Sequence, residues 1–383
     1  MSAPLLPGGT IGILGGGQLG RMSAMAARRL GYKVKTFDPS ANACAAMVAD
    51  NHTSAPWNDG KALQKFADGC GRITLEFENI PPSTVSQVNQ QAPCHPSAEV
   101  LAICQNRRRE KEFLKVQGIP CAPFAVISSL EELTDAVKKI GVPCVLKTAD
   151  FGYDGKGQVK ISDTNTNLSD AWEKLSAPQG VLEAWIPFQL EISVIVARTE
   201  SGETAVYDPA ENIHRNHILH LSLSPARISA TTQREAQALA LKVAEKIKLV
   251  GLMAVEMFVQ DDRIIVNELA PRPHNSGHQT LDANQTSQFE QHIRAVCGLP
   301  LGGTQILKPA VMLNLLGDLW SHGKTPDWTM VLKEPAAKLH LYDKGQAAPG
   351  RKMGHITFTA DTLDVALQKA EALFAVLSKE SVE

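Results

Sequence analysis

Short apolar runs alternate with a helical pattern over the first hundred residues. Thr10–Leu14 and Lys33–Asp38 are strand-like runs, and Gln18–Leu30 between them has apolar positions at helical spacing. Ile73–Phe77 is a further strand-like run, closed by two prolines. Strands that alternate with helices predict a parallel sheet with crossover helices, so we expect a doubly wound α/β unit here.

Strand patterns dominate the rest of the chain. Glu191–Ala197 is β-rich, Thr232–Ile247 has the pattern of a long amphipathic helix, and two strand-like runs with a short turn between them follow at Gly251–Val259 and Arg263–Leu269. Beyond about residue 302 the pattern predicts short strands and a closing helix, at Ala310–Leu315, Ala337–Tyr342, Gly354–Thr359 and 364–377. We therefore expect an α+β centre and a small β-rich C-terminal part.

Composition excludes several classes of protein. A chain of 383 residues predicts two or three domains at ~100–200 residues each. Lys and Arg number 38 against 40 Asp and Glu, so the net charge of −2 gives no field for coating nucleic acid. No apolar run approaches the ~20 residues that a membrane span needs. We expect neither nucleic acid nor a membrane as a partner.

The cysteines and the first residues indicate a cellular compartment. The seven cysteines are scattered and contain no C-x-x-C pair, which favours reduced thiols over a disulfide framework or a zinc site. Met1–Gly9 has no basic segment followed by an apolar one, so it does not resemble a signal peptide. The sequence predicts a cytoplasmic enzyme.

A glycine-rich turn follows the first strand. Gly15-Gly-Gly-Gln-Leu-Gly20 fits G-x-G-x-x-G and opens a helix, and Asp38 ends the next strand. This spacing is typical of NAD-binding folds, in which the acid binds the ribose. A generic phosphate or substrate loop at a helix N-terminus is the alternative. The turn alone leaves both interpretations open.

A second glycine-rich loop, Gly152-Tyr-Asp-Gly-Lys-Gly-Gln158, carries one cation. Its glycines would let backbone N–H groups approach phosphate oxygens, and Lys156 adds a point charge. The loop lacks P-loop spacing, and a plain surface hairpin is the alternative. Lys147, on an otherwise apolar strand, needs a partner, for which a nucleotide phosphate is a candidate.

Two carboxylates lie in apolar surroundings on the paired runs. Glu256 and Glu268 would be costly there without a partner. Together with Asn267 they are the oxygen ligands that Mg²⁺ prefers, with substrate phosphates completing its coordination. Two salt-bridged strand residues are the alternative.

A loop dense in hydrogen-bond donors comes directly after, Ala270-Pro-Arg-Pro-His-Asn-Ser-Gly-His278. Such density favours an anion or substrate site over a plain connector. Asp343-Lys-Gly345 and Gly350-Arg-Lys352 add cations near the C-terminus, for which solvated surface charge is the alternative.

These motifs together resemble the ATP-grasp superfamily and, within it, the N5-carboxyaminoimidazole ribonucleotide synthetases, the biotin-independent carboxylases of purine synthesis. The Asn267–His278 string is highly specific for this family, whereas the first glycine-rich turn is not. The matching segments run nearly end to end: Ile13–Met22, Glu76–Asn79, Gly152–Gln158, Asn267–His278, Tyr342–Lys344 and Pro349–Lys352.

The resemblance implies a fold in three parts. These are a doubly wound, Rossmann-like pre-ATP-grasp domain over 1–100, an ATP-grasp domain over 101–300 with a lid at about 120–190, and a small β-rich C-terminal domain over 301–383. It also implies an ATP-dependent carbon–nitrogen ligase that joins bicarbonate to 5-aminoimidazole ribonucleotide through carboxyphosphate. ATP would be the co-substrate and Mg²⁺ or Mn²⁺ the metal, without biotin, in a homodimer.

The resemblance also implies roles for individual residues. Glu256 and Glu268 would bind the metal, and Asp154, Arg272, His274 and Lys352 would be catalytic. Asp154 would orient the substrate amine and accept its proton. ATP contacts would come from Arg107, Lys147, Gly152, Tyr153, Asp154, Gly155, Lys156, Gly157, Gln158, Glu183, Ala184, Trp185, Ile186, Glu191, His214, Asn267 and Glu268. Contacts to the ribonucleotide and the bicarbonate-derived group would come from Gly17, Gln18, Leu19, Glu76, Tyr153, Arg272, His274, Asn275, Ser276, Gly277, Lys344, Arg351 and Lys352.

Other functions stay as alternatives. Another ATP-grasp ligase, such as a formate-using glycinamide ribonucleotide transformylase or a biotin carboxylase, would share the fold, although His274–His278 argues against both. An NAD-binding module is the alternative from another class, and a catalytically inactive regulatory subunit is a third. Because all the candidate carboxylates and cations are present, an inactive subunit is the least favoured.

Overall fold

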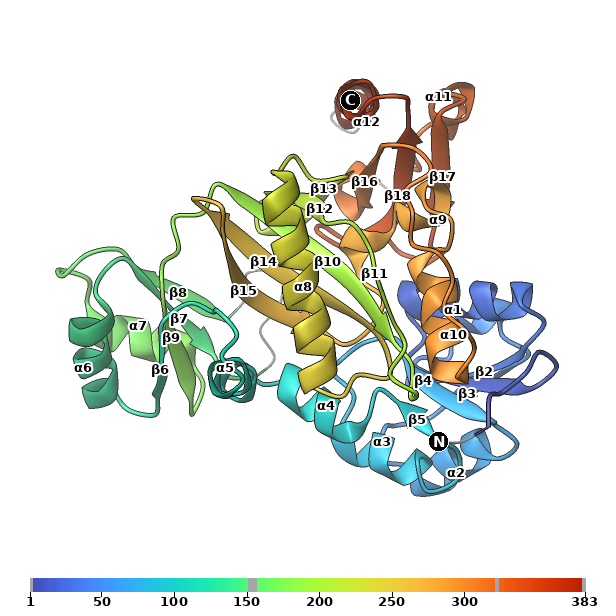
Figure 1. Ribbon diagram of the computed structural model, residues 1–383, viewed down its shortest axis with the longest axis horizontal. Helices are drawn as coiled ribbons and strands as arrows, with labels where there is room; N and C mark the ends of the chain where they lie inside the picture. Colours follow the sequence, from blue (N-terminus) through green and yellow to red (C-terminus); the bar gives the residue numbers. More distant parts are fainter. Residues whose placement is uncertain (1–2, 151–156, 321–323, 381–383) are drawn as a thin grey trace.

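The protein contains three β-sheets in the part of the chain that the structure describes. The structure is a computed structural model that describes residues 3–150, 157–320 and 324–380. A parallel sheet near the N-terminus, a small projecting sheet and a long central sheet are separate in space (Figure 1). This arrangement confirms the mixed α/β and α+β class that the sequence predicts.

The N-terminal sheet is parallel, with five strands in the order β3-β2-β1-β4-β5. Its strands are β1 (Thr10–Leu14), β2 (Lys33–Asp38), β3 (Asn51–Ser54), β4 (Arg72–Leu75) and β5 (Cys94–His95). The helices and short 3₁₀ turn of this region are α1 (Gln18–Arg29), η1 (Ala46–Val48), α2 (Gly60–Ala67), α3 (Pro82–Val88) and α4 (Ala98–Cys104).

Alternation along β1 buries both faces of this sheet. Ile11 and Ile13 pack with Ala24 of α1 and Ile293 of α10 (Gln288–Cys297), whereas Leu14 packs with residues of α2 and α3 on the opposite face. A parallel sheet covered on both faces is the doubly wound arrangement expected from the sequence. Helix α10 thereby docks the N-terminal unit onto the rest of the chain.

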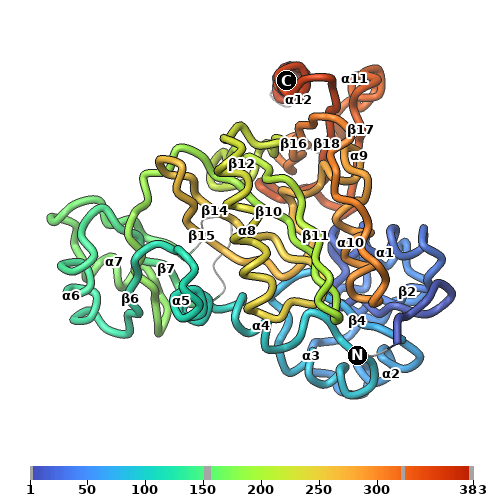
Figure 2. The backbone as a smooth tube through the Cα atoms, viewed as in Figure 1, coloured from blue at the N-terminus to red at the C-terminus, as the bar shows by residue number. Residues whose placement is uncertain are grey.

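The projecting sheet, which we call the lid sheet, is antiparallel in the order β6-β9-β7-β8. Its strands are β6 (Phe124–Ile127), β7 (Cys144–Thr148), β8 (Gln158–Ile161) and β9 (Gly180–Ala184), with helices α6 (Leu130–Ile140) and α7 (Leu168–Leu175). Helix α5 (Arg107–Val116) lies between this sheet and the central one (Figures 1 and 2).

The central sheet has nine strands along the path β15-β14-β10-β12-β13-β16-β18-β17, with β11 paired to β10. Its strands are β10 (Leu190–Arg198), β11 (Thr204–Val206), β12 (Ala210–Arg215), β13 (Ile218–Ser224), β14 (Gly251–Gln260), β15 (Arg263–Ala270), β16 (Ala310–Leu316), β17 (Ala337–Leu341) and β18 (Lys352–Thr359). The other elements are α8 (Ala230–Lys246), η2 (Asn275–Gly277), α9 (Thr280–Ala283), η3 (Gly317–Leu319), α11 (Trp328–Lys333) and α12 (Leu363–Glu380).

The central sheet includes strands from the C-terminal part of the chain. The strands after residue 310 extend it, because β16 pairs antiparallel with β13. The β-rich C-terminal part therefore continues the central sheet. Helix α8 covers one face with its small residues, and β14 and β15 pair as the sequence predicts.

None of the helices in the described residues combines the length and apolarity that a membrane crossing requires.

Candidate active site

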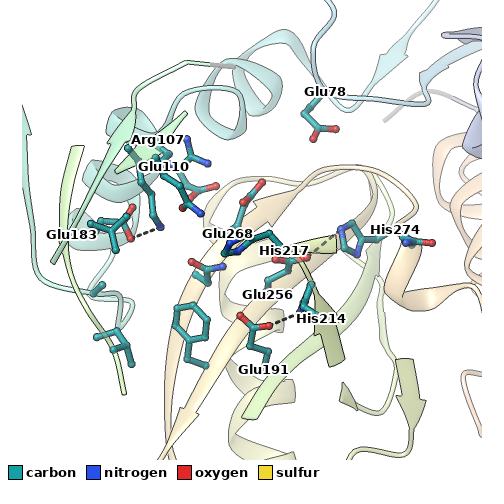
Figure 3. Close-up of a pocket in the computed structure, with 18 of the residues that line it drawn as sticks. Glu78, Arg107, Glu110, Glu183, Glu191, His214, His217, Glu256, Glu268 and His274 are labelled. Atoms are coloured by element: carbon teal, nitrogen blue, oxygen red, sulfur yellow. Dashed lines mark hydrogen bonds and ion pairs between the residues drawn. The ribbon is translucent and has the colours of Figure 1, made fainter. Parts of the chain in front are cut away.

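A cavity of about 970 Å³ lies where the N-terminal unit, the lid sheet and the central sheet meet. Figure 3 shows carboxylates and imidazoles pointing into it from several elements. It brings together most of the predicted site residues: Gln18, Leu19, Glu76, Arg107, Lys147, Gln158, Glu183, Ala184, Trp185, Ile186, Glu191, His214, Glu256, Asn267, Glu268, Arg272, His274, Asn275 and Lys352.

Some predicted residues are not part of this lining. Gly17, Gly157, Ser276, Gly277, Lys344 and Arg351 are described but do not line the cavity. Gly152, Tyr153, Asp154, Gly155 and Lys156 lie outside the described residues, so the predicted phosphate loop and the predicted base are not placed. Among the described residues, Gly157 directly precedes β8, which begins at Gln158.

Lys147 has a protein partner on the lid side. Its Nζ lies 3.1 Å from Oε2 of Glu183, which is buried, and Nζ of Lys111 lies 3.3 Å from the same oxygen. Although burial acts to raise the pKa of Glu183, Lys111 and Lys147 lower it to about 2. Arg107 adds a third cation close by. Several cations around one carboxylate leave a positive region, which suits a polyphosphate.

The segment expected to contact adenine leads out of β9. Trp185 is 42% exposed, and Nζ of Lys160 lies 4.0 Å from the centre of its ring. Phe188 stacks on Phe258 with 4.5 Å between the ring centres and 6° between the planes. Both phenylalanines line the cavity and give it a flat apolar wall, which the sequence did not reveal.

The cavity floor is made of carboxylates on neighbouring strands. Glu256 of β14 lies directly opposite Glu268 of β15, and the register shifts immediately after this pair. Burial, Glu268 and Glu191 raise the pKa of Glu256 to about 7. Like charges opposed across two strands are unfavourable unless a cation lies between them. The two carboxylates and the Asn267 side chain therefore fit a hard divalent metal.

Imidazoles accompany these carboxylates (Figure 3). Nδ1 of His214 lies 2.5 Å from Oε2 of Glu191, and Nε2 of His274 lies 3.2 Å from Oε1 of Glu256. Burial acts to lower the pKa of His214, but its bond to Glu191 outweighs this and raises it. Burial and the cations Arg272 and Lys352 hold the pKa of His274 well below its usual value. His274 is therefore neutral, whereas His214 gains charge more readily.

Ser276 bonds the ring of His274 on the side that faces away from the cavity, which explains why Ser276 does not line the cavity. Its hydroxyl lies 2.8 Å from Nδ1 of His274 and accepts a hydrogen bond from Ser193 at 2.6 Å. Donation from Ser276 to Nδ1 leaves the proton of His274 on Nε2, facing Glu256. Gln288 fixes the same residue by bonding both its backbone N–H and its carbonyl.

Carboxylates of the chain itself fill the glycine-rich turn. Glu76 accepts hydrogen bonds from the backbone N–H groups of Gly17 and Gly20, each at 2.9 Å, and Asp38 accepts one from Gly16 at 2.8 Å. A Cβ on Gly15 would lie 2.1 Å from Cγ of Glu76. The donors that a dinucleotide pyrophosphate would need are thus already used, which argues against the NAD alternative.

Cations also lie close to Glu76. The electrostatic surroundings of Lys344 include Glu76, Arg351 and Lys352. Burial, reinforced by the two cations, lowers the pKa of Lys344 to about 8. Arg351 is fixed through a hydrogen bond of 2.7 Å from Nη1 to the carbonyl of Gln346. This cluster lies beside the predicted substrate residues and suits an anionic group of a substrate.

Asp282, His340 and His355 form a separate cluster whose possible ligand atoms lie within 4.8 Å of one another. The rings of His340 and His355 are stacked, however, with 4.4 Å between centres and 8° between planes. The nitrogen lone pair of an imidazole lies in the plane of its ring. Because these two rings are nearly parallel, their lone pairs do not converge on one ion. We assign no metal to this cluster.

Family models match most of the chain. The ribonucleotide synthetase preATP-grasp domain matches residues 9–105, the ATP-grasp domain matches 112–289, and the phosphoribosylaminoimidazole carboxylase C-terminal domain matches 310–369. The N5-carboxyaminoimidazole ribonucleotide synthase of Bacillus subtilis is 46% identical over 367 residues, which are 95% of each chain. This chain belongs to the N5-carboxyaminoimidazole ribonucleotide synthase family.

Solved structures of this synthase family have the same fold. An ADP complex of an N5-carboxyaminoimidazole ribonucleotide synthetase superposes with a TM-score of 0.93, at 44% identity over 100% of both chains. The Aspergillus clavatus enzyme, in complex with ADP and 5-aminoimidazole ribonucleotide, superposes with a TM-score of 0.87 at 33% identity, covering 97% of this chain and 98% of that one. The chain is thus an ATP-grasp ligase of the synthase family. It is therefore neither an NAD-binding module nor a formate-using ligase.

Besides the two phenylalanines, three charged residues near the synthase site carried no role in the sequence-based prediction. Glu78 pairs with Arg272, and Glu110 and Lys111 of α5 are buried beside the floor of the cavity. Glu78 belongs to the quoted Glu76–Asn79 string, so the string itself was a signal. Glu110 and Lys111 belong to a basic helix whose pattern resembles a solvated surface.

Proposed function

We propose that the chain catalyses the ATP-dependent carboxylation of 5-aminoimidazole ribonucleotide with bicarbonate, giving N5-carboxyaminoimidazole ribonucleotide, ADP and phosphate in purine biosynthesis. The observation that carries this proposal is the single cavity that joins the lid residues to the Glu76–Arg272 side across the opposed pair Glu256 and Glu268. Two substrates can thus meet over one carboxylate floor.

The lid side suits the nucleotide. Arg107 and Lys147 would contact phosphates, and the loop Gly152–Gln158 would cover them. Residues Glu183 to Ile186 would contact the adenine edge. Glu191, which bonds His214, would accept hydrogen bonds from the ribose hydroxyls. Mg²⁺ or Mn²⁺ bound by Glu256 and Glu268, with Asn267 beside them, would neutralise charge on the transferred phosphoryl group.

The chemistry proceeds in two steps. Bicarbonate oxygen attacks the γ-phosphorus of ATP, so a P–O bond to bicarbonate forms and ADP leaves, giving carboxyphosphate. The exocyclic amine of the ribonucleotide then attacks the carboxyl carbon of carboxyphosphate, and phosphate leaves. Alternatively, carboxyphosphate first breaks into CO₂ and phosphate, and the amine attacks the CO₂. In both routes the amine loses a proton. Arg272 and the neutral His274, which line the cavity, would bind the carboxyl donor, and Asp154 is the proposed proton acceptor.

The opposite side suits the ribonucleotide. Gln18 and Leu19 at the start of α1, together with Glu76, would contact it, and Lys344, Arg351 and Lys352 would bind its phosphate. We also propose the domain limits 1–100, 101–300 and 301–383, a homodimer and a cytoplasmic location. Free thiols at all seven cysteines are consistent with that location.

Product analysis tests the proposal directly. The protein is incubated with ATP, Mg²⁺ and ¹⁴C-bicarbonate, with and without 5-aminoimidazole ribonucleotide, and both phosphate release and trapped ¹⁴C are measured. We expect label in the product and ribonucleotide-dependent phosphate release in equal amounts. A parallel reaction with formate and glycinamide ribonucleotide should release no phosphate. Turnover with that pair, or none with bicarbonate, would contradict the proposal.

A further inference from the structure

Helix α5 bonds strand β15 on both sides of Glu268. Oε2 of Glu110 accepts a hydrogen bond of 2.9 Å from the backbone N–H of Leu269, and Nζ of Lys111 donates one of 2.9 Å to the carbonyl of Asn267. Glu110 is 2% exposed and Lys111 is 1% exposed. Two consecutive residues of one helix thus hold the two residues that flank a predicted metal ligand.

The strand needs this support because its ladder is irregular at that point. Glu256 pairs with Glu268, but the next residue, Met257, pairs with Val266, so Asn267 is an extra residue in β15. An extra residue of this kind locally disrupts the ladder and bends the strand. In addition, β15 is at the edge of the central sheet, where it pairs with the strand β14. Lys111 and Glu110 therefore bond backbone groups of β15 directly beside its irregular residue.

The same helix also contacts the lid sheet. Lys111 pairs with Glu183 of β9, which in turn pairs with Lys147 of β7. At the start of α5, the backbone N–H of Arg107 donates to the carbonyl of Ala149 at 2.8 Å, directly before the predicted phosphate loop. Helix α5 thus connects the lid strands with the strand that carries Glu268. In Figure 3, Arg107 and Glu110 lie between Glu183 and Glu268.

Burying this pair is costly, which argues for a purpose beyond helix packing. A buried charge destabilises a protein unless it is paired and hydrogen-bonded. Two apolar side chains at these positions would bury this part of α5 at a lower free-energy cost. They would, however, leave the carbonyl of Asn267 and the N–H of Leu269 without these hydrogen-bond partners.

We infer that Glu110 and Lys111 are positioning residues that hold Glu268 in its metal-binding position and link that position to the lid sheet. The inference rests on the proposed metal site. Partners that orient a metal ligand typically change metal affinity 10–100-fold when they are removed. A purely structural pair would instead change stability and nucleotide affinity together, with no separate effect on the metal.

Metal binding without turnover tests this inference. Mn²⁺ binding to the full-length protein saturated with ADP is followed by electron paramagnetic resonance, and ADP affinity without metal is measured by calorimetry. For Lys111→Met we expect Mn²⁺ affinity to fall by about 10–100-fold. Because Lys111 also belongs to the cations around Glu183, metal-free ADP affinity should fall too, but by less than the Mn²⁺ affinity. Lys115→Met, an exposed position on the same helix, is the matched control and should change neither.

A second pair of variants keeps the test decisive if Lys111→Met does not fold. Glu110→Gln retains an acceptor for the N–H of Leu269 and should keep Mn²⁺ affinity close to wild type. Glu110→Met has a similar length without an acceptor and should lose about tenfold. Equal Mn²⁺ affinity in these two folded variants would overturn the inference. Because the assay contains neither bicarbonate nor ribonucleotide, failure of the proposed reaction would not affect it, and a wild type that binds no Mn²⁺ would refute the metal site itself.

Discussion

Glu78 and Arg272, which are 194 residues apart in the sequence, form a two-point ion pair between the N-terminal unit and the loop after β15. Nη2 of Arg272 donates to Oε1 of Glu78 at 2.8 Å, and its Nε donates to the other carboxylate oxygen. Although burial acts to raise the pKa of Glu78, Arg272 holds it below its usual value. Arg272, which is predicted to bind the carboxyl donor, is therefore held in position by Glu78 of the N-terminal unit.

Glu78→Gln should separate this positioning from nucleotide binding. Glutamine keeps the shape but removes the charge, so Arg272 loses its ionic partner and shifts. We expect ribonucleotide-dependent phosphate release to fall by about 100-fold, the size of loss that a misplacement near 1 Å can cause. ADP affinity by calorimetry should stay unchanged. Glu112→Gln, at an exposed pair with Arg108 at 4.0 Å, is the control. Near-normal turnover in Glu78→Gln would show that Glu78 does not position Arg272 for the reaction.

Gly15 and Gly69 provide a matched pair for the carboxylate-filled turn. Both have positive φ, +105° and +70°, but alanine at Gly69 meets nothing within 4 Å, whereas alanine at Gly15 meets Glu76. Both substitutions should cost at least about 0.5–1 kcal/mol of unfolding free energy through backbone strain. Only Gly15→Ala should also weaken ribonucleotide binding, because it displaces Glu76. Denaturant unfolding and calorimetry measure the two effects, and equal ribonucleotide affinities would exclude the coupling.

Local patterns predicted much of this architecture, and their success has a physical reason. The strand, turn and helix from Thr10 to Arg29 and the paired strands around Glu256 and Glu268 are built from neighbouring residues, so their periodicity is visible in sequence. Lys111 has the opposite character. Its partners Glu183 and Asn267 are distant in the chain, and its basic surroundings resemble a solvated helix face.

The same limit applied to partners inside the site. The apolar run around Lys147 correctly indicated that this lysine needs a partner, but the partner is Glu183 on the neighbouring strand β9. Likewise, the donor-rich loop indicated a site without showing that Ser276 faces inward to support His274. Which side of a loop faces a cavity depends on tertiary packing, so a single sequence does not contain that information in readable form.

Glu268→Gln should show opposite effects on metal binding and on the metal-free fold. Removing a ligand should lower Mn²⁺ affinity of the ADP complex at least about tenfold and lower ATP turnover with it. Because Glu268 opposes Glu256 across the strands, removing one like charge should leave the metal-free protein equally or more stable. Thermal unfolding without metal checks the second effect. A variant that is less stable yet binds Mn²⁺ normally would contradict both assignments.

Lys344 should set an upper pH limit on ribonucleotide binding. Its pKa, lowered to about 8 by burial, means that its ammonium group is present below about pH 8 and is lost above it. A phosphate that pairs with this ammonium should therefore bind more weakly as the pH rises, with the dissociation constant approaching a tenfold increase per pH unit above about 8. The folded protein holds fewer protons on this lysine than the unfolded chain between about pH 8 and 10.5, so this group makes folding more favourable as the pH rises through that window. Weaker binding there would not reflect unfolding driven by this lysine.

Two variants decide whether Lys344 causes that limit. Lys344→Arg keeps its charge throughout the range, because guanidinium groups titrate above pH 12, and should flatten the dependence of ribonucleotide affinity between pH 7.5 and 9.5. Lys338→Arg, at an exposed position on β17, should retain the wild-type profile. Calorimetric titration at four pH values, with ADP affinity followed in parallel, separates the ribonucleotide effect from any change on the nucleotide side. If Lys344→Arg binds the ribonucleotide well but weakens with pH as the wild type does, another group causes the limit, and the cation cluster does not act through Lys344.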